Sequence, residues 1–466
     1  MRTLRQLVAV VVILLLIGSW FDVSAYSVLT HEAIIDSAWE MNIRPLLLER
    51  YPNATRDDLH KAHAYVYGGA IVQDLGYYPH GSHYFSDLTH YVRSGEFVQT
   101  MLRDAKDINE YAFALGALAH YAADDYGHSI AVNRAVPLLY PKLQRKYGDV
   151  ATYEDDPSAH LKTEFGFDVL QVAKGRYAPD SYHDFIGFEI SQPLLERAFE
   201  ETYSIPLNSV FRDLDSVIGS YRYDIHTLIP RATRVAWALK QKDIQRDQPG
   251  ITRRKFLYNL SRASYRKEWG KNYRGLSFGT RFLAFIISLI PKVGPLSALK
   301  LRMPTPQADT MFMASFNTAF DEYRHLLDEE RDGQLKLPNI NFDTGMPTRP
   351  GAYFMADQSY AHLLDDLAKN HFNVISVGTQ SDILAYFQDA NAPIVTKKNS
   401  KAWERLKMEL DQLKSAGLLQ SITSDPNPEE DWNKPPWKRH SLNGVGTSAN
   451  REIGVFGFLI LETYTS

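Results

Sequence analysis

Hydrophobic residues recur three and four positions apart along most of the chain, which is the spacing of amphipathic helices. Turns rich in glycine, proline and histidine separate these segments, as in residues 76–81. Strict alternation of apolar and polar residues, which would indicate strands, is scarce. The pattern therefore predicts an all-α fold whose main part is a multi-helix bundle. The clearest predicted helices are residues 32–39, 56–67, 109–123, 158–173, 193–203 and 210–240.

The first residues have the three-part layout of a secretory signal peptide. Arg2 and Arg5 precede an apolar run over residues 7–17, and Val23 and Ala25 place small residues before a cleavage site. The run is shorter than the ~20 apolar residues that a spanning helix needs, and an uncleaved anchor is the alternative. We expect Sec-type export, with the protein secreted or retained in a periplasm or cell envelope. The mature chain would begin at Tyr26.

A different composition begins near residue 253. Basic residues are frequent from Arg253 to Arg281, with Glu268 as the acid among them, and an apolar run follows over residues 282–290. This run cannot span a bilayer, but basic residues beside an apolar segment suit contact with a membrane surface. A buried hairpin with a solvated basic face is an equal alternative. The candidate membrane-contacting residues are Phe282, Phe285, Ile286 and Ile290.

These features divide the chain into consecutive parts. A signal peptide (1–25) precedes a helical domain (26–245) and the basic and apolar segment (246–304). A helical C-terminal region (305–420) follows, and the tail (421–466) is rich in Pro, Asn, Ser and charge, which predicts that it is largely disordered.

Composition restricts the chemistry that is possible. The 466 residues carry a formal net charge of −4, which gives no global indication of nucleic-acid binding. There is no cysteine, and a chain of this length can be stable without disulfides. Any metal would therefore be held by His, Asp, Glu and backbone groups.

Potential metal ligands are concentrated in the first third of the chain. His120 and Asp124, and likewise His160 and Glu164, are four positions apart, so each pair lies on one face of a helix within reach of a single ion. His128 extends the first row if the helix continues through Gly127. Imidazole and carboxylate are zinc ligands, and the interior of a helical bundle is a usual place to assemble them. The clustered residues are His31, Asp74, His80, His83, Asp87, His90, His120, Asp124, Asp125, His128, His160 and Glu164.

These motifs resemble the zinc-dependent phospholipase C family, whose relatives include bacterial phosphatidylcholine-hydrolysing enzymes and single-strand nucleases of the fungal type. The resemblance covers roughly residues 26–240. It is carried by residues 25–31, residues 69–74, the His120, Asp124 and His128 series, and the His160 and Glu164 pair.

The resemblance implies two to three zinc ions in the interior of an all-helical fold. A first zinc would be held by Asp74, His90, His120 and Asp124, and a second by His128, His160 and Glu164. A third would be held by the amine and carbonyl of Tyr26 with His31 and the bridging Asp124. Asp74 would also be the candidate general base, and Asp125 is a second candidate.

The sequence departs from the family in three places. Tyr26 stands where the family usually has Trp, and the spacing from Asp124 to His128 is two residues shorter than usual. His83 lies in the same segment as His90 and is an alternative ligand. The shorter spacing leaves the position of His128 open.

The resulting hypothesis is an exported phosphodiesterase that hydrolyses the phosphoester of phospholipid headgroups with metal-activated water. A single-strand nuclease is an alternative, with nucleic acid as its substrate and aromatic residues such as Tyr77, Tyr78, Tyr84 and Phe85 as a stacking platform. A non-catalytic, metal-stabilised envelope protein is a further alternative.

Overall fold

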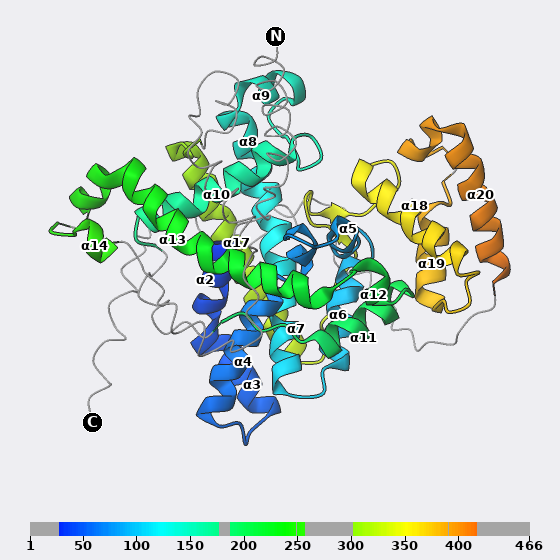
Figure 1. Ribbon diagram of the computed structural model, residues 1–466, viewed down its shortest axis with the longest axis horizontal. Coiled ribbons are helices and arrows are strands. Elements are labelled where there is room, and N and C mark those ends of the chain that lie inside the picture. The colour runs from blue at the N-terminus through cyan, green and yellow to red at the C-terminus, as the bar shows by residue number, and fades with distance from the viewer. Residues whose placement is uncertain (1–27, 177–186, 248, 257–301, 390, 417–466) are drawn as a thin grey trace, which may run out of the picture.

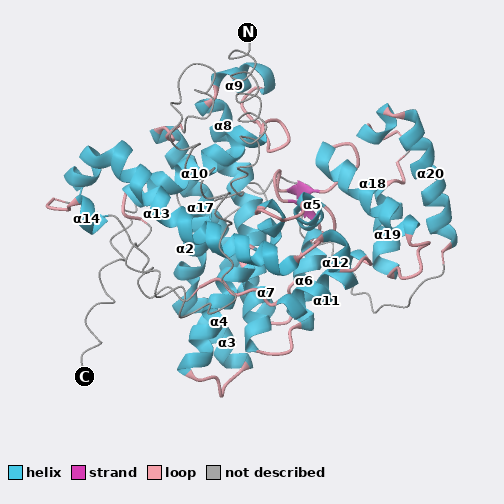
Figure 2. Cartoon of the chain, in the orientation of Figure 1, coloured by secondary structure: helices cyan, strands magenta, loops and turns pink. Residues whose placement is uncertain are grey.

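A computed structural model describes residues 28–176, 187–247, 249–256, 302–389 and 391–416. Within them the chain is almost entirely helical, as Figure 2 shows, and the all-α prediction is confirmed. The strands of the described part are β1 (Ile340–Asn341) and β2 (Met346–Pro347), which pair antiparallel. The signal peptide, Tyr26, the candidate membrane-contacting residues and the tail lie outside the described residues.

The helices follow the predicted segments closely. The first half contains α2 (Val28–Ala38), α3 (Arg44–Arg50), α4 (Arg56–Gly69), α5 (His83–Tyr91), α6 (Ser94–Asp104), α7 (Ile108–Tyr126), α8 (Asn133–Leu139), α9 (Pro141–Tyr147) and α10 (Pro157–Ala173). Short π-helical segments, η1 (Trp39–Ile43) and η3 (Gly127–Val132), follow α2 and α7, and a 3-10 helix, η2 (Val72–Tyr77), follows α4.

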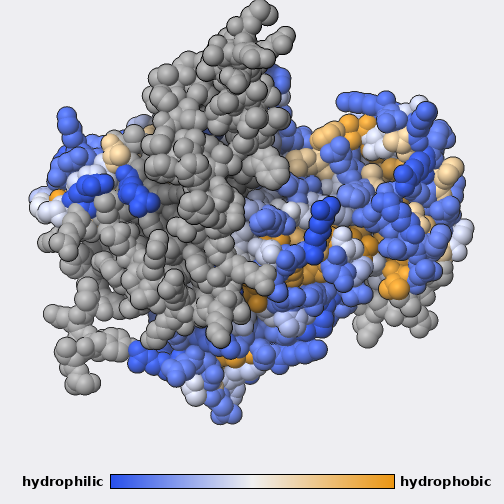
Figure 3. Space-filling view, viewed as in Figure 1, coloured by the Kyte–Doolittle hydropathy of each residue, from blue (hydrophilic) through white to orange (hydrophobic). Residues whose placement is uncertain are grey.

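The second half is also helical. It contains α11 (Gln192–Tyr203), α12 (Leu207–Val210), α13 (Leu214–Asp247), α14 (Arg253–Phe256), α17 (Pro306–Arg331), α18 (Phe354–Lys369), α19 (Val377–Tyr386), the 3-10 helix η7 (Val395–Lys398) and α20 (Ser400–Ser415). The helices α17 to α20 agree with the prediction of a helical C-terminal region. The α18–α20 group lies at one end of the molecule, where its visible face is mostly hydrophilic (Figures 1 and 3).

Helix α7 is the centre of the bundle, and its residues from Glu110 to Tyr126 are all buried. The Asp107 side chain caps its first turn by accepting hydrogen bonds from the backbone N–H groups of Asn109 and Glu110. Helices α4 and α17 pack along it. The Tyr323 hydroxyl of α17 donates a hydrogen bond to the Leu115 carbonyl at 3.0 Å, so the C-terminal region is part of the same core.

Glycines let α4 and α7 approach until their backbones touch. A Cβ atom on Gly116 would lie 2.1 Å from the Val66 carbonyl oxygen and 2.7 Å from the Ala70 nitrogen. A Cβ on Gly69 would lie 1.9 Å from the Phe113 carbonyl oxygen. No side chain fits in that space, so Gly69 of α4 and Gly116 of α7 are required by the packing of these two helices. Gly68 is required by another contact, because its Cβ would lie 1.8 Å from the Glu189 carbonyl oxygen.

The C-terminal region is joined to the bundle through α6. Arg93 is buried, and its guanidinium bonds Glu96, the Thr202 carbonyl and the Thr379 hydroxyl, which connects α6 to α11 and α19. The chain before β1 passes so close to α6 that a Cβ on Gly95 would lie 2.4 Å from the Leu337 carbonyl oxygen. In the described part of the chain, no helix is both long and apolar enough to cross a membrane.

We expect Gly116→Ala to lower the free energy of unfolding by about 2–3 kcal/mol, because overpacking forces α4 away from α7. Gly333→Ala is the matched control, since Gly333 has φ 67° and nothing within 4 Å of its added Cβ. It should cost only about 1 kcal/mol from the left-handed backbone. Denaturant titration of both variants measures the difference, and equal losses would contradict the packing argument.

Candidate metal centre

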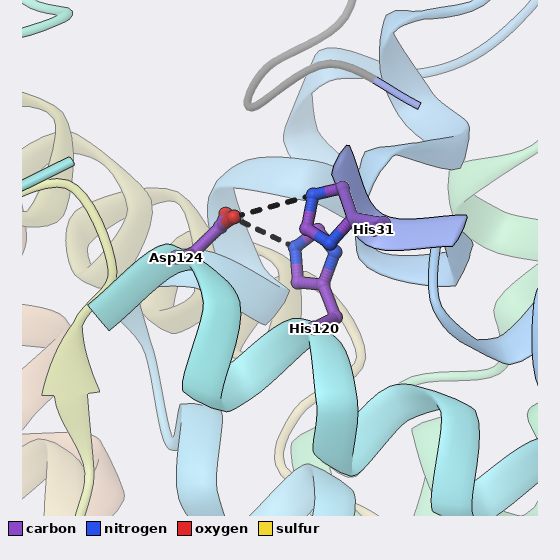
Figure 4. Close-up of side chains that lie close together, drawn as sticks. All are labelled: His31, His120 and Asp124. Atoms are coloured by element: carbon purple, nitrogen blue, oxygen red, sulfur yellow. Dashed lines mark ion pairs between the residues drawn. The ribbon is translucent and has the colours of Figure 1, made fainter. Parts of the chain in front are cut away.

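Asp124 of α7 is the meeting point of three histidines. Its Oδ1 lies 3.5 Å from His31 Nε2, and its Oδ2 lies 3.1 Å from His120 Nε2 and 3.5 Å from His90 Nε2. Figure 4 shows His31 of α2 and His120 of α7 pointing toward the Asp124 carboxylate, with their rings stacked at 4.6 Å. A carboxylate shared in this way has the geometry of a bridging ligand.

Asp74 extends this cluster. Its Oδ1 lies 3.3 Å from His90 Nε2, and Asp74, His90 and His120 form one group of potential ligands within 4.8 Å. His31, His120 and Asp124 form another group by the same measure. His120 therefore belongs to both groups.

Another set of ligands lies at the junction of η3 and α10. The Oε1 atom of Glu164 is 3.2 Å from His128 Nε2 and 2.9 Å from His160 Nε2. The aspartate Asp343, from the turn after β1, completes a group with His128 and His160 within 4.8 Å. All of these side chains are buried.

The distances between ligand atoms match what zinc requires. Tetrahedral zinc with nitrogen and oxygen ligands at about 2.0–2.2 Å holds neighbouring ligand atoms about 3.3–3.6 Å apart. Asp74, Asp124 and Glu164 are buried, and among the described residues their carboxylate oxygens have no hydrogen-bond partner other than the imidazoles that face them. Unsatisfied buried carboxylates are costly, so the donor set fits metal ions that would satisfy them.

Backbone carbonyls orient the histidine rings. The Nδ1 atoms of His90, His120 and His128 lie 2.7 Å from the Ser86 oxygen, 3.0 Å from the Ala70 oxygen and 3.1 Å from the Phe342 oxygen, respectively. An N–H at Nδ1 that donates to a carbonyl leaves Nε2 as the basic atom. In the neutral ring, each Nε2 therefore faces the carboxylates with its lone pair, which is the arrangement of metal-binding histidines.

Contacts at the ends of α2 and α10 place His31. The Asp168 carboxylate of α10 accepts hydrogen bonds from the Leu29 backbone N–H at 3.2 Å and from the Thr30 hydroxyl at 2.9 Å. These contacts fix the first turn of α2 against α10, and His31 lies in that turn.

Asp74 is placed by its neighbour in η2. The Gln73 side chain donates to the Ala117 carbonyl of α7 at 3.1 Å, and the Gln73 carbonyl accepts a hydrogen bond from the Ser86 hydroxyl at 2.6 Å. The Gly76 N–H donates to the same hydroxyl. The short helix that carries Asp74 is therefore attached to both α5 and α7.

A change of helix type separates His128 from the row that begins with His120 and Asp124. Helix α7 ends at Tyr126 and continues directly into η3, whose hydrogen bonds span five residues and widen the turn. The His128 side chain faces Glu164 and His160 of α10, while His120 and Asp124 face each other. The short spacing between Asp124 and His128 is thus accommodated by the π-helical turn.

The charges of the cluster shift its pKa values strongly. Burial lowers the pKa of His90, but the carboxylates of Asp124 and Asp74 outweigh it and raise the pKa to about 9. Burial also lowers the pKa of His128, but the carboxylates of Asp124 and Glu164 outweigh it and raise the pKa to about 10. Burial would raise the pKa of Asp124, yet the charges of His120 and His128 hold it well below its usual value. Burial raises the pKa of Asp74.

The remaining candidates from the sequence lie elsewhere. His83 is exposed and its ring contacts Tyr77, so it is His90 that the structure brings to the cluster. Asp87 belongs to none of the described ligand groups, and burial raises its pKa to about 6. Asp125 and His80 are also absent from those groups among the described residues.

Sequence reasoning missed Asp343. It lies far along the chain from the other candidate ligands, within the region predicted as a helical C-terminal part (305–420). Nothing in its local sequence distinguishes it from an ordinary turn aspartate, because Asp followed by Thr and Gly is a common turn composition.

Zinc binding should release protons. At neutral pH the zinc-free protein carries protons on His90 and His128, whose pKa values are about 9 and about 10, and zinc takes the neutral imidazole. We expect the apparent zinc affinity to increase by about tenfold per pH unit for each proton released, from pH 6 up to these pKa values. Titration calorimetry in buffers of different ionisation enthalpy measures the protons, and binding without proton release would contradict the shifts.

Asp124→Asn should lower the zinc content more than any single histidine substitution, because the two carboxylate oxygens of Asp124 together face three imidazoles. His90→Gln should lower it less, and His83→Gln is the matched control that should leave it unchanged. Metal analysis after dialysis against a weak chelator gives the comparison. A loss with His83→Gln equal to that with His90→Gln would show that the cluster is wrongly assigned.

Residues 30–213 match the family model described as zinc dependent phospholipase C. No curated protein and no solved structure matches the chain. The matched span contains every predicted protein ligand from His31 to Glu164, whereas Asp343 lies outside it. The family consists of zinc-dependent hydrolases, and the buried His, Asp and Glu clusters are compatible with metal binding. Residues 30–213 therefore form a domain of the zinc-dependent phospholipase C family.

Proposed function

We propose that this protein is a zinc-dependent phosphodiesterase that hydrolyses the phosphoester of phospholipid headgroups, as a phospholipase C does. The observation that carries the proposal is the Asp124 carboxylate, whose two oxygens face His31, His90 and His120 at 3.1–3.5 Å in a buried site. The family match supports the same reaction class. When bound, zinc would act as a Lewis acid toward the phosphoryl group and lower the pKa of water.

The residues of the chain have separate roles in this proposal. Asp74, His90, His120 and Asp124 would hold one zinc, and His128, His160 and Glu164 a second. His31 would share Asp124 with a third ion if Tyr26 is the mature N-terminus. The Asp74 carboxylate would also be the candidate general base toward the metal-activated water.

Lipid is favoured over nucleic acid by the position of the aromatic residues. Tyr77, Tyr78 and Phe85 are buried, and Tyr84 stacks on His362 at 3.7 Å. A nuclease platform needs aromatic faces that are open to bases, and these four residues do not offer one among the described residues. The basic and apolar sequence of residues 253–290 supports peripheral membrane contact.

Export is part of the same proposal. Its support is the sequence of residues 1–25, and it would place the enzyme outside the cell or in a periplasm or envelope. Sequencing the N-terminus of the mature protein tests this, because cleavage after Ala25 makes the Tyr26 amine available and a retained leader does not.

The zinc-loaded protein should release diacylglycerol and a phosphorylated headgroup from phosphatidylcholine vesicles. We expect a chelator to abolish turnover, added zinc to restore it, and Asp124→Asn to lower kcat/KM by at least about a hundredfold, since it removes a shared charge at the reaction centre. His83→Gln is the control with unchanged activity.

Single-stranded DNA is assayed in parallel under the same conditions. Turnover of DNA alone would replace the lipid proposal with a nuclease. Lipid turnover that survives chelation would overturn the metal mechanism. Zinc binding without turnover of either substrate would indicate a structural metal protein.

A further inference from the structure

Asp343 reaches the metal centre from a part of the chain that the family match does not include. It lies in the turn between β1 and β2, and its Oδ1 is 3.9 Å from His128 Nδ1. The ligand atoms of His128, His160 and Asp343 lie within 4.8 Å of one another. Neighbouring ligands of a tetrahedral zinc ion are about 3.3–3.6 Å apart, so a small movement of the Asp343 side chain would bring this carboxylate within reach of an ion held by His128 and His160.

The two oxygens of Asp343 have different surroundings. Oδ2 accepts hydrogen bonds from the Tyr153 backbone N–H at 2.9 Å and from the Tyr353 hydroxyl at 2.6 Å. Oδ1 is buried and has no hydrogen-bond partner among the described residues. One oxygen is therefore held by two donors, and the other is presented to His128 and His160.

The turn that carries Asp343 is rigidly built. The Asn341 side chain accepts hydrogen bonds from the backbone N–H groups of Asp343 at 2.9 Å and Thr344 at 3.1 Å. The Gly345 N–H donates to the Asn341 carbonyl at 2.8 Å, and Gly345 has φ 66°, which favours glycine. The Asp343 backbone position is thus fixed by its own hairpin.

The hairpin is also fixed against the bundle beside the ligands. The Ser94 hydroxyl bonds the Ile340 carbonyl at 2.6 Å and accepts from the Ile340 N–H at 3.0 Å. The Phe342 N–H donates to the carbonyl of His90 at 3.2 Å, and its carbonyl bonds His128 Nδ1. The Phe342 ring lies 5.3 Å from that of His90. Residues 340–343 therefore contact ligands of both sets.

We propose that Asp343 is a ligand of the second zinc, together with His128, His160 and Glu164, and that the C-terminal region thereby completes the metal centre of the family domain. The proposal rests on the proposed zinc site. Its chemical basis is that three ligands leave one position of a tetrahedral zinc open. Asp343 Oδ1 is a preoriented carboxylate oxygen beside His128 and His160, and its partner oxygen is held by donors as metal-binding carboxylates are.

Asp343→Asn tests this without removing the hairpin contacts, because the amide oxygen can still accept from Tyr153 and Tyr353. Tyr353→Phe is the matched control, since it removes one hydrogen bond to Oδ2 and leaves Oδ1 in place. Zinc per chain is measured by metal analysis at buffered free zinc, for both variants and the unsubstituted protein, and circular dichroism verifies the fold. We expect Asp343→Asn to weaken one class of zinc by about tenfold or more, and Tyr353→Phe to change it much less.

The outcomes separate this inference from the function on which it rests. Unsubstituted protein that binds no zinc would overturn the proposed function. Normal zinc binding that Asp343→Asn leaves unchanged would overturn only the role of Asp343.

Crystals of the unsubstituted protein grown with zinc decide the question if Asp343→Asn does not fold. An anomalous peak about 2.0–2.2 Å from Asp343 Oδ1 supports the inference. A peak bound by His128, His160 and Glu164 but more than about 3 Å from Asp343 overturns it.

Discussion

Burying carboxylates inside a helical bundle costs free energy unless positive charge or hydrogen bonds compensate for it. Asp74, Asp124 and Glu164 are buried, and the imidazoles that face them supply this charge in the zinc-free protein. The raised pKa values of His90 and His128 are the measure of that compensation. Helices α2, α5, α7 and α10 are arranged so that these charges meet.

The backbone contact between α4 and α7 sets the precision of this arrangement. Gly69 and Gly116 allow an approach that brings the Ala70 carbonyl to His120 Nδ1 at 3.0 Å. The same contact thus packs the core and fixes the orientation of a ligand ring. A change in helix separation would alter both, which is why glycine occupies both positions.

Helical periodicity was sufficient to predict the fold class, most helices and the proximity of the His–carboxylate pairs on α7 and α10, because those features depend on residues close together in sequence. The prediction of a row through His128 was incomplete, since the pattern of apolar residues does not distinguish an α-helical from a π-helical turn at Gly127. Choosing between His83 and His90 required knowing which face of α5 is buried against the cluster. The position of Asp343 could be found only from the tertiary structure, because contacts with Ser94 and His90 bring the hairpin of residues 340–347 to the cluster.

Because of that hairpin, the segment that matches the family is shorter than the part of the chain that packs as one core. The segment recognised by similarity, residues 30–213, ends before α17, yet the Tyr323 hydroxyl of α17 bonds the middle of α7 and the hairpin lies against the ligands. A fragment cut at the limit of the similarity would expose apolar surface of α7 and lose the wall formed by Phe342. The segment that matches the family and the part that packs as one core are therefore of different lengths, and expression of the domain would have to include the chain through the hairpin.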